Sequence, residues 1–274
     1  MTKIHPIRTG SVKVRQAQVS GKGHGITRTL NMLTDTNWTD WLPIHAWAIE
    51  QGNRVVVVDT GETARVHELG YHPRWHPFYN RSVKFRVAPE DELGPQLRSL
   101  GIQASDVSDV ILTHLHTDHA GGLSHVVGSR TWVHASELKR AQGLMGKLNG
   151  YLPHRWPKWW QPEALQFREN AVGPFLQSAD VTGAGEILAI PTPGHTLGHI
   201  SVLVLGSPSV FLAGDTSYTQ DLLLSGNVDG VSPNEEISRN TLSMIRALAL
   251  ERPLVYLPSH DPQGPARLEA NSTL

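Results

Sequence analysis

The sequence predicts a layered α/β fold in which helices cover the outer faces of the sheets. Two observations support this fold class: short apolar runs alternate with polar or helix-forming segments, and the same alternation occurs twice along the chain. The length of 274 residues suits one large domain or two small ones. We predict a single domain over residues 1–274.

The first half of the chain contains the first run of predicted elements. Strands are predicted at 44–49, 55–59, 107–112 and 131–134, and a helix at 90–100. Gln51-Gly52-Asn53 joins the first two strands as a hairpin-like turn. Gly101 follows the helix and can take the left-handed conformation that commonly ends one.

The second half repeats this pattern after an interruption. Strands are predicted at 186–190, 199–205, 210–213 and 254–257, and a long amphipathic helix at 234–250. Residues 141–174 form a Pro- and Trp-rich insertion in which no regular pattern persists. This insertion either lines a pocket for an apolar ligand or contributes to a dimer interface.

Composition excludes several classes of site. The chain has no cysteine, which excludes disulfides, thiolate zinc sites, iron–sulfur clusters and cysteine nucleophiles, but it has 15 histidines. Its 24 basic and 25 acidic residues leave a net charge of −1, so the sequence predicts neither a nucleic-acid partner nor a membrane partner. The N-terminus lacks a secretory pattern and no apolar run reaches membrane-spanning length, so we expect a cytoplasmic protein.

A histidine-rich segment directly follows the strand predicted at 107–112. Alternate residues of an extended chain point the same way, so His114 and His116 can face one metal ion. A turn after them can present Asp118 and His119 to a second ion. Three histidines and an aspartate within six positions indicate a metal site rather than surface residues.

Three further ionisable residues follow apolar strands in the second half. His195, Asp215 and His260 occupy the same position relative to a strand as His114 does. Together these residues supply five histidines and two aspartates, enough to hold two divalent ions with a bridging carboxylate. Imidazole and carboxylate favour Zn²⁺, with Mn²⁺, Co²⁺ or Fe²⁺ as alternatives.

The ordered signature His114-x-His116-x-Asp118-His119, His195, Asp215, His260 resembles the metallo-β-lactamase superfamily in its dinuclear form. The resemblance implies a four-layer αβ/βα sandwich with two metals at the edge between the sheets. It assigns His114, His116 and His195 to one metal, Asp118, His119 and His260 to the other, and Asp215 to both. Asp59, which closes a valine run, matches the first motif as a hydrogen-bond partner of a ligand.

Asp215-Thr216-Ser217-Tyr218 is similar to the N-acyl-homoserine lactonases, the quorum-quenching branch of this superfamily. That resemblance implies hydrolysis of the lactone ring to an N-acyl-homoserine. Tyr218 then contacts the lactone carbonyl, and Asp118 carries a proton to the leaving oxygen. The missing cysteine ligand argues against a true β-lactamase. An organophosphate hydrolase, a glyoxalase II-like thioesterase and a non-catalytic metal-binding module are the alternatives.

The acyl chain of such a substrate requires an apolar trough. Six apolar residues from the two aromatic-rich stretches are candidates for its lining: Met32, Trp38, Trp41, Leu148, Leu152 and Trp156. The family resemblance also implies a homodimer.

Overall fold

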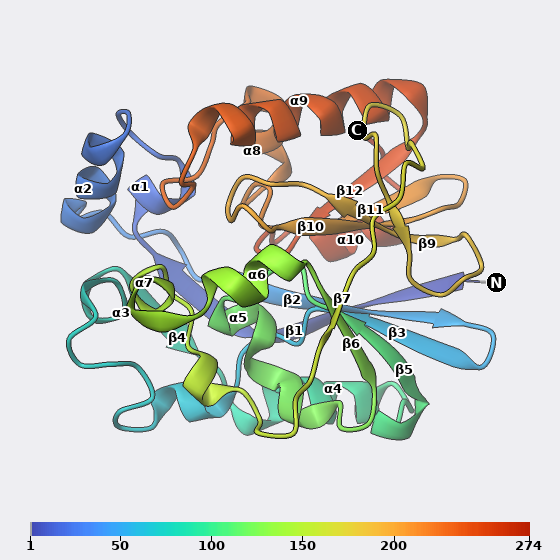
Figure 1. Cartoon of the computed structure of the whole chain (residues 1–274), viewed down its shortest axis with the longest axis horizontal. Coiled ribbons are helices and arrows are strands. Elements are labelled where there is room, and N and C mark those ends of the chain that lie inside the picture. Colours follow the sequence, from blue (N-terminus) through green and yellow to red (C-terminus); the bar gives the residue numbers. More distant parts are fainter. Residues whose placement is uncertain (1) are drawn as a thin grey trace. The chain divides into compact units, whose positions relative to one another are not determined.

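The computed structural model describes residues 2–274 and divides them into two compact units. Unit 1 comprises residues 2–13 and 40–164, and unit 2 comprises residues 14–39 and 165–274. Each unit contains one sheet (Figure 1). Each also has its own apolar core. The assignment of residues 1–274 to a single domain stays a prediction.

Unit 1 is built on a seven-stranded mixed sheet with the order β4-β1-β2-β3-β5-β6-β7. Its strands are β1 (Thr2–Val14), β2 (Leu42–Gln51), β3 (Arg54–Val58), β4 (Val83–Arg86), β5 (Val107–Ile111), β6 (Arg130–Val133) and β7 (Glu163–Ala164). Strands β1, β2 and β3 pair antiparallel, whereas β3, β5, β6 and β7 pair parallel. The parallel strands therefore bring their carboxyl ends to one edge.

The valine run of β3 lies at the centre of this sheet. Val55 and Val57 belong to the core cluster of unit 1, and Val56 and Val58 on the opposite face are also buried. Burial of both faces explains why the run is apolar without alternation.

Short helices connect the strands of unit 1. They are α3 (Pro77–Arg81), α4 (Leu93–Ser99), α5 (Thr117–Ala120), α6 (Ala135–Arg140) and α7 (Gly143–Leu148), with 3-10 turns at Ala64–His67, Pro89–Asp91, Ala104–Asp106, Gly121–His125 and Pro153–Arg155. Leu93 and Leu97 of α4 place its apolar side in the core cluster. The helix ends as predicted before Gly101, whose φ is +80°.

Unit 2 contains a five-stranded sheet with the order β12-β11-β10-β9-β8. Its strands are β8 (Ala179–Asp180), β9 (Ile187–Pro191), β10 (Ile200–Val204), β11 (Ser209–Gly214) and β12 (Leu254–Pro258). Its helices are α1 (Gln16–Val19), α2 (Ile26–Thr34), α8 (Gln220–Ser225), α9 (Glu235–Glu251) and α10 (Gly264–Glu269). Strands β11 and β12 pair parallel, so the residues that follow them emerge at the same edge.

The long helix α9 covers one face of this second sheet. It begins at Asn234, whose side chain accepts hydrogen bonds from the N–H groups of Glu236 and Ile237. Leu242, Ile245 and Leu248 recur at helical spacing and lie in the core cluster that also contains residues of β11 and β12.

The structure confirms the predicted strands and the long helix to within two residues, but it corrects the helix predicted at 90–100. Glu92 is extended, with ψ of 155°, and separates the turn Pro89–Asp91 from α4. Its carboxylate accepts hydrogen bonds from Ala64 N–H and the Thr63 hydroxyl, which explains the break.

Strand β1, helix α2 and several short helices were not predicted from the sequence. Pro6 and Gly10 interrupt the pattern of β1, and the register with β2 shifts between Arg8 and Ser11. Residues 141–174 are mostly irregular, as predicted, although α7 and β7 lie within them. Among the residues that the structure describes, no helix is long and apolar enough to cross a membrane.

Candidate metal centre

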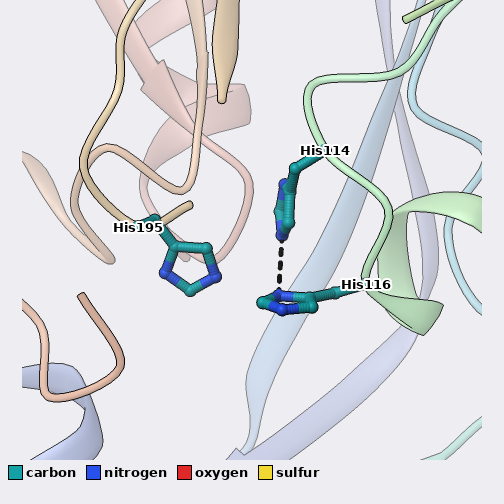
Figure 2. Close-up of side chains that lie close together, drawn as sticks. All are labelled: His114, His116 and His195. Atoms are coloured by element: carbon teal, nitrogen blue, oxygen red, sulfur yellow. Dashed lines mark hydrogen bonds between the residues drawn. The ribbon is translucent and has the colours of Figure 1, made fainter. Parts of the chain in front are cut away.

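The histidine-rich segment of unit 1 leaves the carboxyl end of β5 and enters α5. His114 is fully buried and His116 is partly exposed. The two rings meet edge to face with centroids 4.6 Å apart, and His114 Nε2 lies 3.0 Å from His116 Nδ1 (Figure 2). Two imidazole nitrogens that converge at this distance are placed to share one cation.

Asp59 fixes the start of this segment and one of its histidines. Its Oδ1 accepts a hydrogen bond from Thr113 N–H at 2.8 Å, and its Oδ2 lies 2.8 Å from His119 Nδ1. When Nδ1–H donates to this carboxylate, His119 Nε2 is the nitrogen that can bind a metal. Asp59 therefore selects the tautomer of His119.

The backbone at Asp59 is strained, and the neighbouring Thr60 packs closely against the segment that contains His119 and Gly122. Asp59 has φ of +59°, a left-handed conformation that is uncommon for a residue other than glycine. Beside it, the Thr60 hydroxyl and N–H both donate to His119 O. A Cβ on Gly122 would lie 2.2 Å from Thr60 O, so only glycine fits there.

His116 is held from its other side by the loop after α7. Its Nε2 lies 3.1 Å from Asn149 O. The buried carboxylate of Glu137 accepts hydrogen bonds from Leu115 N–H and from the Tyr151 hydroxyl, at 3.2 and 3.0 Å. Glu137 thus links the histidine-rich segment to the predicted insertion.

In unit 2, Asp215 follows β11 and lies between two histidines, one after β9 and one after β12. Its Oδ2 is 3.6 Å from His195 Nε2 and 3.3 Å from His260 Nε2. All three side chains are nearly inaccessible to solvent. A single carboxylate oxygen close to two imidazole nitrogens is the arrangement expected of a carboxylate that bridges two ions.

Two residues that support this half of the centre escaped the sequence analysis. Asp229 Oδ2 lies 3.0 Å from His195 Nδ1, while its Oδ1 accepts hydrogen bonds from the N–H groups of Val231 and Ser232. His199 Nε2 accepts a hydrogen bond from Asp215 N–H at 3.0 Å. The ring of His199 therefore fixes the backbone of Asp215.

Each unit brings together part of the candidate donor set. In unit 1, His114 lies beside His116 and His119, with ring centroids 4.6 and 4.0 Å apart, and Asp118 Oδ1 is 4.0 Å from His119 Nε2. In unit 2, Asp215 lies beside His195 and His260. This donor set contains only imidazole nitrogen and carboxylate oxygen, which suits Zn²⁺ and the neighbouring first-row divalent ions. The residues present therefore fit a metal centre.

A buried carboxyl group lies close to the segment in unit 1. Burial raises the pKa of Glu62 to about 7, and the negative charge of Asp118 acts in the same direction. Hydrogen bonds from Thr63 N–H and the Tyr71 hydroxyl partly offset this increase.

Tyr218 lies against His260, one of the candidate ligands of unit 2. Its ring stacks on His260 with centroids 5.2 Å apart and an interplanar angle of 24°. Its hydroxyl accepts a hydrogen bond from Gln18 Nε2 at 2.9 Å. The buried phenol therefore has a defined orientation beside the candidate metal ligands.

The six residues proposed for an apolar trough lie in different surroundings. Leu152 is fully buried, and Trp156 packs against the core of unit 1. Both therefore have the surroundings of core residues. Trp41 lies beneath the Arg86 guanidinium and Trp38 beneath that of Arg15. Met32 is buried in α2 and Leu148 is exposed on α7.

Comparison with known sequences gives a match over most of the chain. Residues 39–260 match the model of the family described as the Metallo-beta-lactamase superfamily. An N-acyl homoserine lactonase of Bacillus sp is 25% identical over 229 residues, which is 80% of this chain and 82% of that protein.

Solved structures with the same fold match nearly the whole chain. An N-acyl homoserine lactone hydrolase with the product N-hexanoyl-L-homoserine at its catalytic metal centre has a TM-score of 0.74 at 19% identity, covering 95% of this chain and 94% of that one. AidC, a dizinc quorum-quenching lactonase in complex with a product, has a TM-score of 0.66 at 14% identity, covering 95% and 87%. These likenesses confirm the predicted αβ/βα sandwich.

Proposed function

Since the chain belongs to the metallo-beta-lactamase superfamily, we propose that it is a dinuclear metal-dependent hydrolase that opens the ring of N-acyl-homoserine lactones. The observation that carries this proposal is the position of Tyr218, stacked on His260 at the end of the sequence Asp215-Thr-Ser-Tyr218. The curated relative and the two structural neighbours are named as lactonases or as a lactone hydrolase, which supports the same reaction.

The proposed ligands are five histidines and two aspartates, contributed by both units. His114, His116 and His195 hold one ion, Asp118, His119 and His260 hold the other, and Asp215 bridges them. Asp59 and Asp229 orient His119 and His195 through Nδ1, because each carboxylate lies within hydrogen-bond distance of that nitrogen. Zn²⁺ suits these donors best, and the neighbour named as a dizinc enzyme supports that choice.

Two divalent cations would supply Lewis acidity for the lactone carbonyl and lower the pKa of a water nucleophile. The chain itself supplies the other steps. The Tyr218 hydroxyl donates a hydrogen bond to the oxygen on which negative charge develops. Asp118 carries the proton of the attacking water to the ring oxygen as the carbonyl–oxygen bond breaks. The product is the ring-opened N-acyl-homoserine.

We further propose where the acyl chain binds, in which compartment the enzyme works and how many subunits it has. The acyl chain lies along apolar residues of 32–41, with Met32 and Trp38 as its first contacts. Each CH₂ group that such a trough buries adds about 0.8 kcal/mol to binding. We also propose that the enzyme is cytoplasmic and forms a homodimer.

A substrate panel tests the function. Metal-loaded protein is given N-acyl-homoserine lactones of several chain lengths, a phosphotriester, S-lactoylglutathione and a β-lactam, and the products are followed by mass spectrometry. We expect lactone opening at least about a hundredfold faster than the other reactions, a difference of about 2.7 kcal/mol in activation free energy. Preference for the phosphotriester or the thioester would identify one of the alternative hydrolases instead.

A further inference from the structure

Gln18, on the short helix α1 of unit 2, makes a buried side-chain contact with Tyr218. Gln18 is 5% exposed, and its Nε2 donates to the Tyr218 hydroxyl oxygen at 2.9 Å. The two residues are 200 positions apart in the sequence. Among the residues that the structure describes, Gln18 Oε1 has no hydrogen-bond partner. A buried amide that leaves its own acceptor unsatisfied costs stability, so this contact is not explained by packing alone.

From this contact we propose that Gln18 is a positioning residue for the reaction, acting through Tyr218. An N–H that donates to a phenol oxygen occupies a lone pair and directs the O–H bond elsewhere. Hydrogen bonds in a chain also polarise one another, so the phenol becomes a stronger donor. The inference rests on the proposed function, because it assigns the Tyr218 O–H to the oxygen that becomes negative during ring opening.

The backbone around Gln18 is itself fixed, which a positioning role requires. Gln18 O accepts a hydrogen bond from Gly230 N–H at 2.7 Å, and Gly21 N–H donates to Val228 O at 2.9 Å. A Cβ on Gly230 would lie 2.2 Å from Ala17 O, so glycine is required for this approach. The segment 16–21 is therefore held against the loop 228–230.

Arg28, on α2, secures the same loop from a second direction. This buried guanidinium donates from Nε to Asp229 O at 3.0 Å and also reaches Val228 O. Asp229 is the residue whose carboxylate contacts His195. The segment of residues 16–34 thus contacts Tyr218 directly and supports the loop that orients a candidate ligand.

The test compares Gln18→Met and Gln18→Glu with wild type. Gln18→Met removes the donor at nearly constant volume, and we expect kcat to fall about five- to tenfold with KM within about twofold, the effect of one hydrogen bond. Gln18→Glu replaces the donor by an acceptor that draws the phenol proton toward itself, so we expect a larger fall. Gln16→Met, an exposed change on the same helix, is the matched control and should leave kcat unchanged.

A double-mutant cycle separates positioning from a structural effect. In the Tyr218→Phe background, Gln18→Met should change kcat by less than about twofold. Its effect on the midpoint of thermal unfolding should likewise be smaller in that background than in the wild-type background. An equal loss of kcat in both backgrounds, or wild-type kcat in Gln18→Met, would overturn this inference and leave the proposed function standing. A metal-loaded wild-type chain that opens no lactone would overturn the proposed function, and this inference with it.

Discussion

Asp229 Oδ2 lies 3.0 Å from His195 Nδ1, and both side chains are buried. The other carboxylate oxygen is held by the N–H groups of Val231 and Ser232, so Asp229 cannot rotate without losing those hydrogen bonds. His119 has the same kind of partner in Asp59. In each pair a carboxylate fixes the histidine tautomer whose Nε2 can bind metal.

Asp229→Asn should weaken metal binding. The amide retains one acceptor for Val231 and Ser232, but it turns an N–H toward His195 Nδ1 and disfavours the required tautomer. We expect an affinity about 10–100-fold lower, measured as metal retained after dialysis against a graded chelator. Asp221→Asn on the exposed start of α8 is the control, and equal retention in both variants would contradict the assigned role.

Tyr218→Phe should lower turnover without loss of metal. Removal of one preorganised donor to a developing oxyanion typically lowers kcat about 10²–10³-fold. Metal content by elemental analysis should stay at the wild-type value, because the proposed ligands are imidazoles and carboxylates and do not include the phenol. Unchanged kcat would refute a catalytic role for Tyr218.

Metal removal should destabilise the protein and reverse on metal addition. Ions that bind only the folded chain stabilise it by about 2.7 kcal/mol at a hundred times Kd, so chelation should lower Tm by about 5–10 °C. Calorimetry with and without chelator, then with added Zn²⁺, measures this shift. Asp215→Ala, which removes the carboxylate between His195 and His260, should show a much smaller response to chelator. An identical response would place the metal elsewhere.

Stability should fall in acid because of His72. Burial, assisted by the charge of Arg155, lowers the pKa of His72 to about 4 from its ordinary 6.5. Because the folded pKa is depressed, the stabilisation is present above about pH 6.5 and is lost as pH falls toward 4. Between pH 7 and pH 5 this site should cost about 2 kcal/mol of unfolding free energy.

His72→Phe isolates that contribution. The ring of His72 stacks on Tyr79 and Phe85, with centroids 4.1 and 5.6 Å apart, so an aromatic replacement retains the stacking. Urea unfolding at pH 7 and pH 5 should show a smaller acid loss in this variant than in wild type. An equal loss in both proteins would show that other groups govern the acid response.

The positions of the candidate ligands were predictable because each follows an apolar strand, and strand ends gather at a sheet edge. His114, His195, Asp215 and His260 all have this position in the structure. The strained Asp59 was also recognisable, from the valine run that precedes it.

Other features of the candidate site and of the fold depend on contacts between distant residues, which the local sequence pattern does not encode. Asp229 lies in a loop 34 positions from His195, and Gln18 lies 200 positions from Tyr218. No periodicity connects such pairs. Strand β1 was missed because Pro6 and Gly10 break its alternation, and Leu152 was assigned to a trough although it is buried.

The mass of the product shows whether water opens the lactone ring. Metal-loaded protein is incubated with an N-acyl-homoserine lactone in ¹⁸O-labelled water, and the product is analysed by mass spectrometry. Lactone hydrolysis predicts one intact N-acyl-homoserine that carries a single ¹⁸O in its new carboxylate. Release of the fatty acid with an unopened lactone, or recovery of unchanged substrate, would contradict the account.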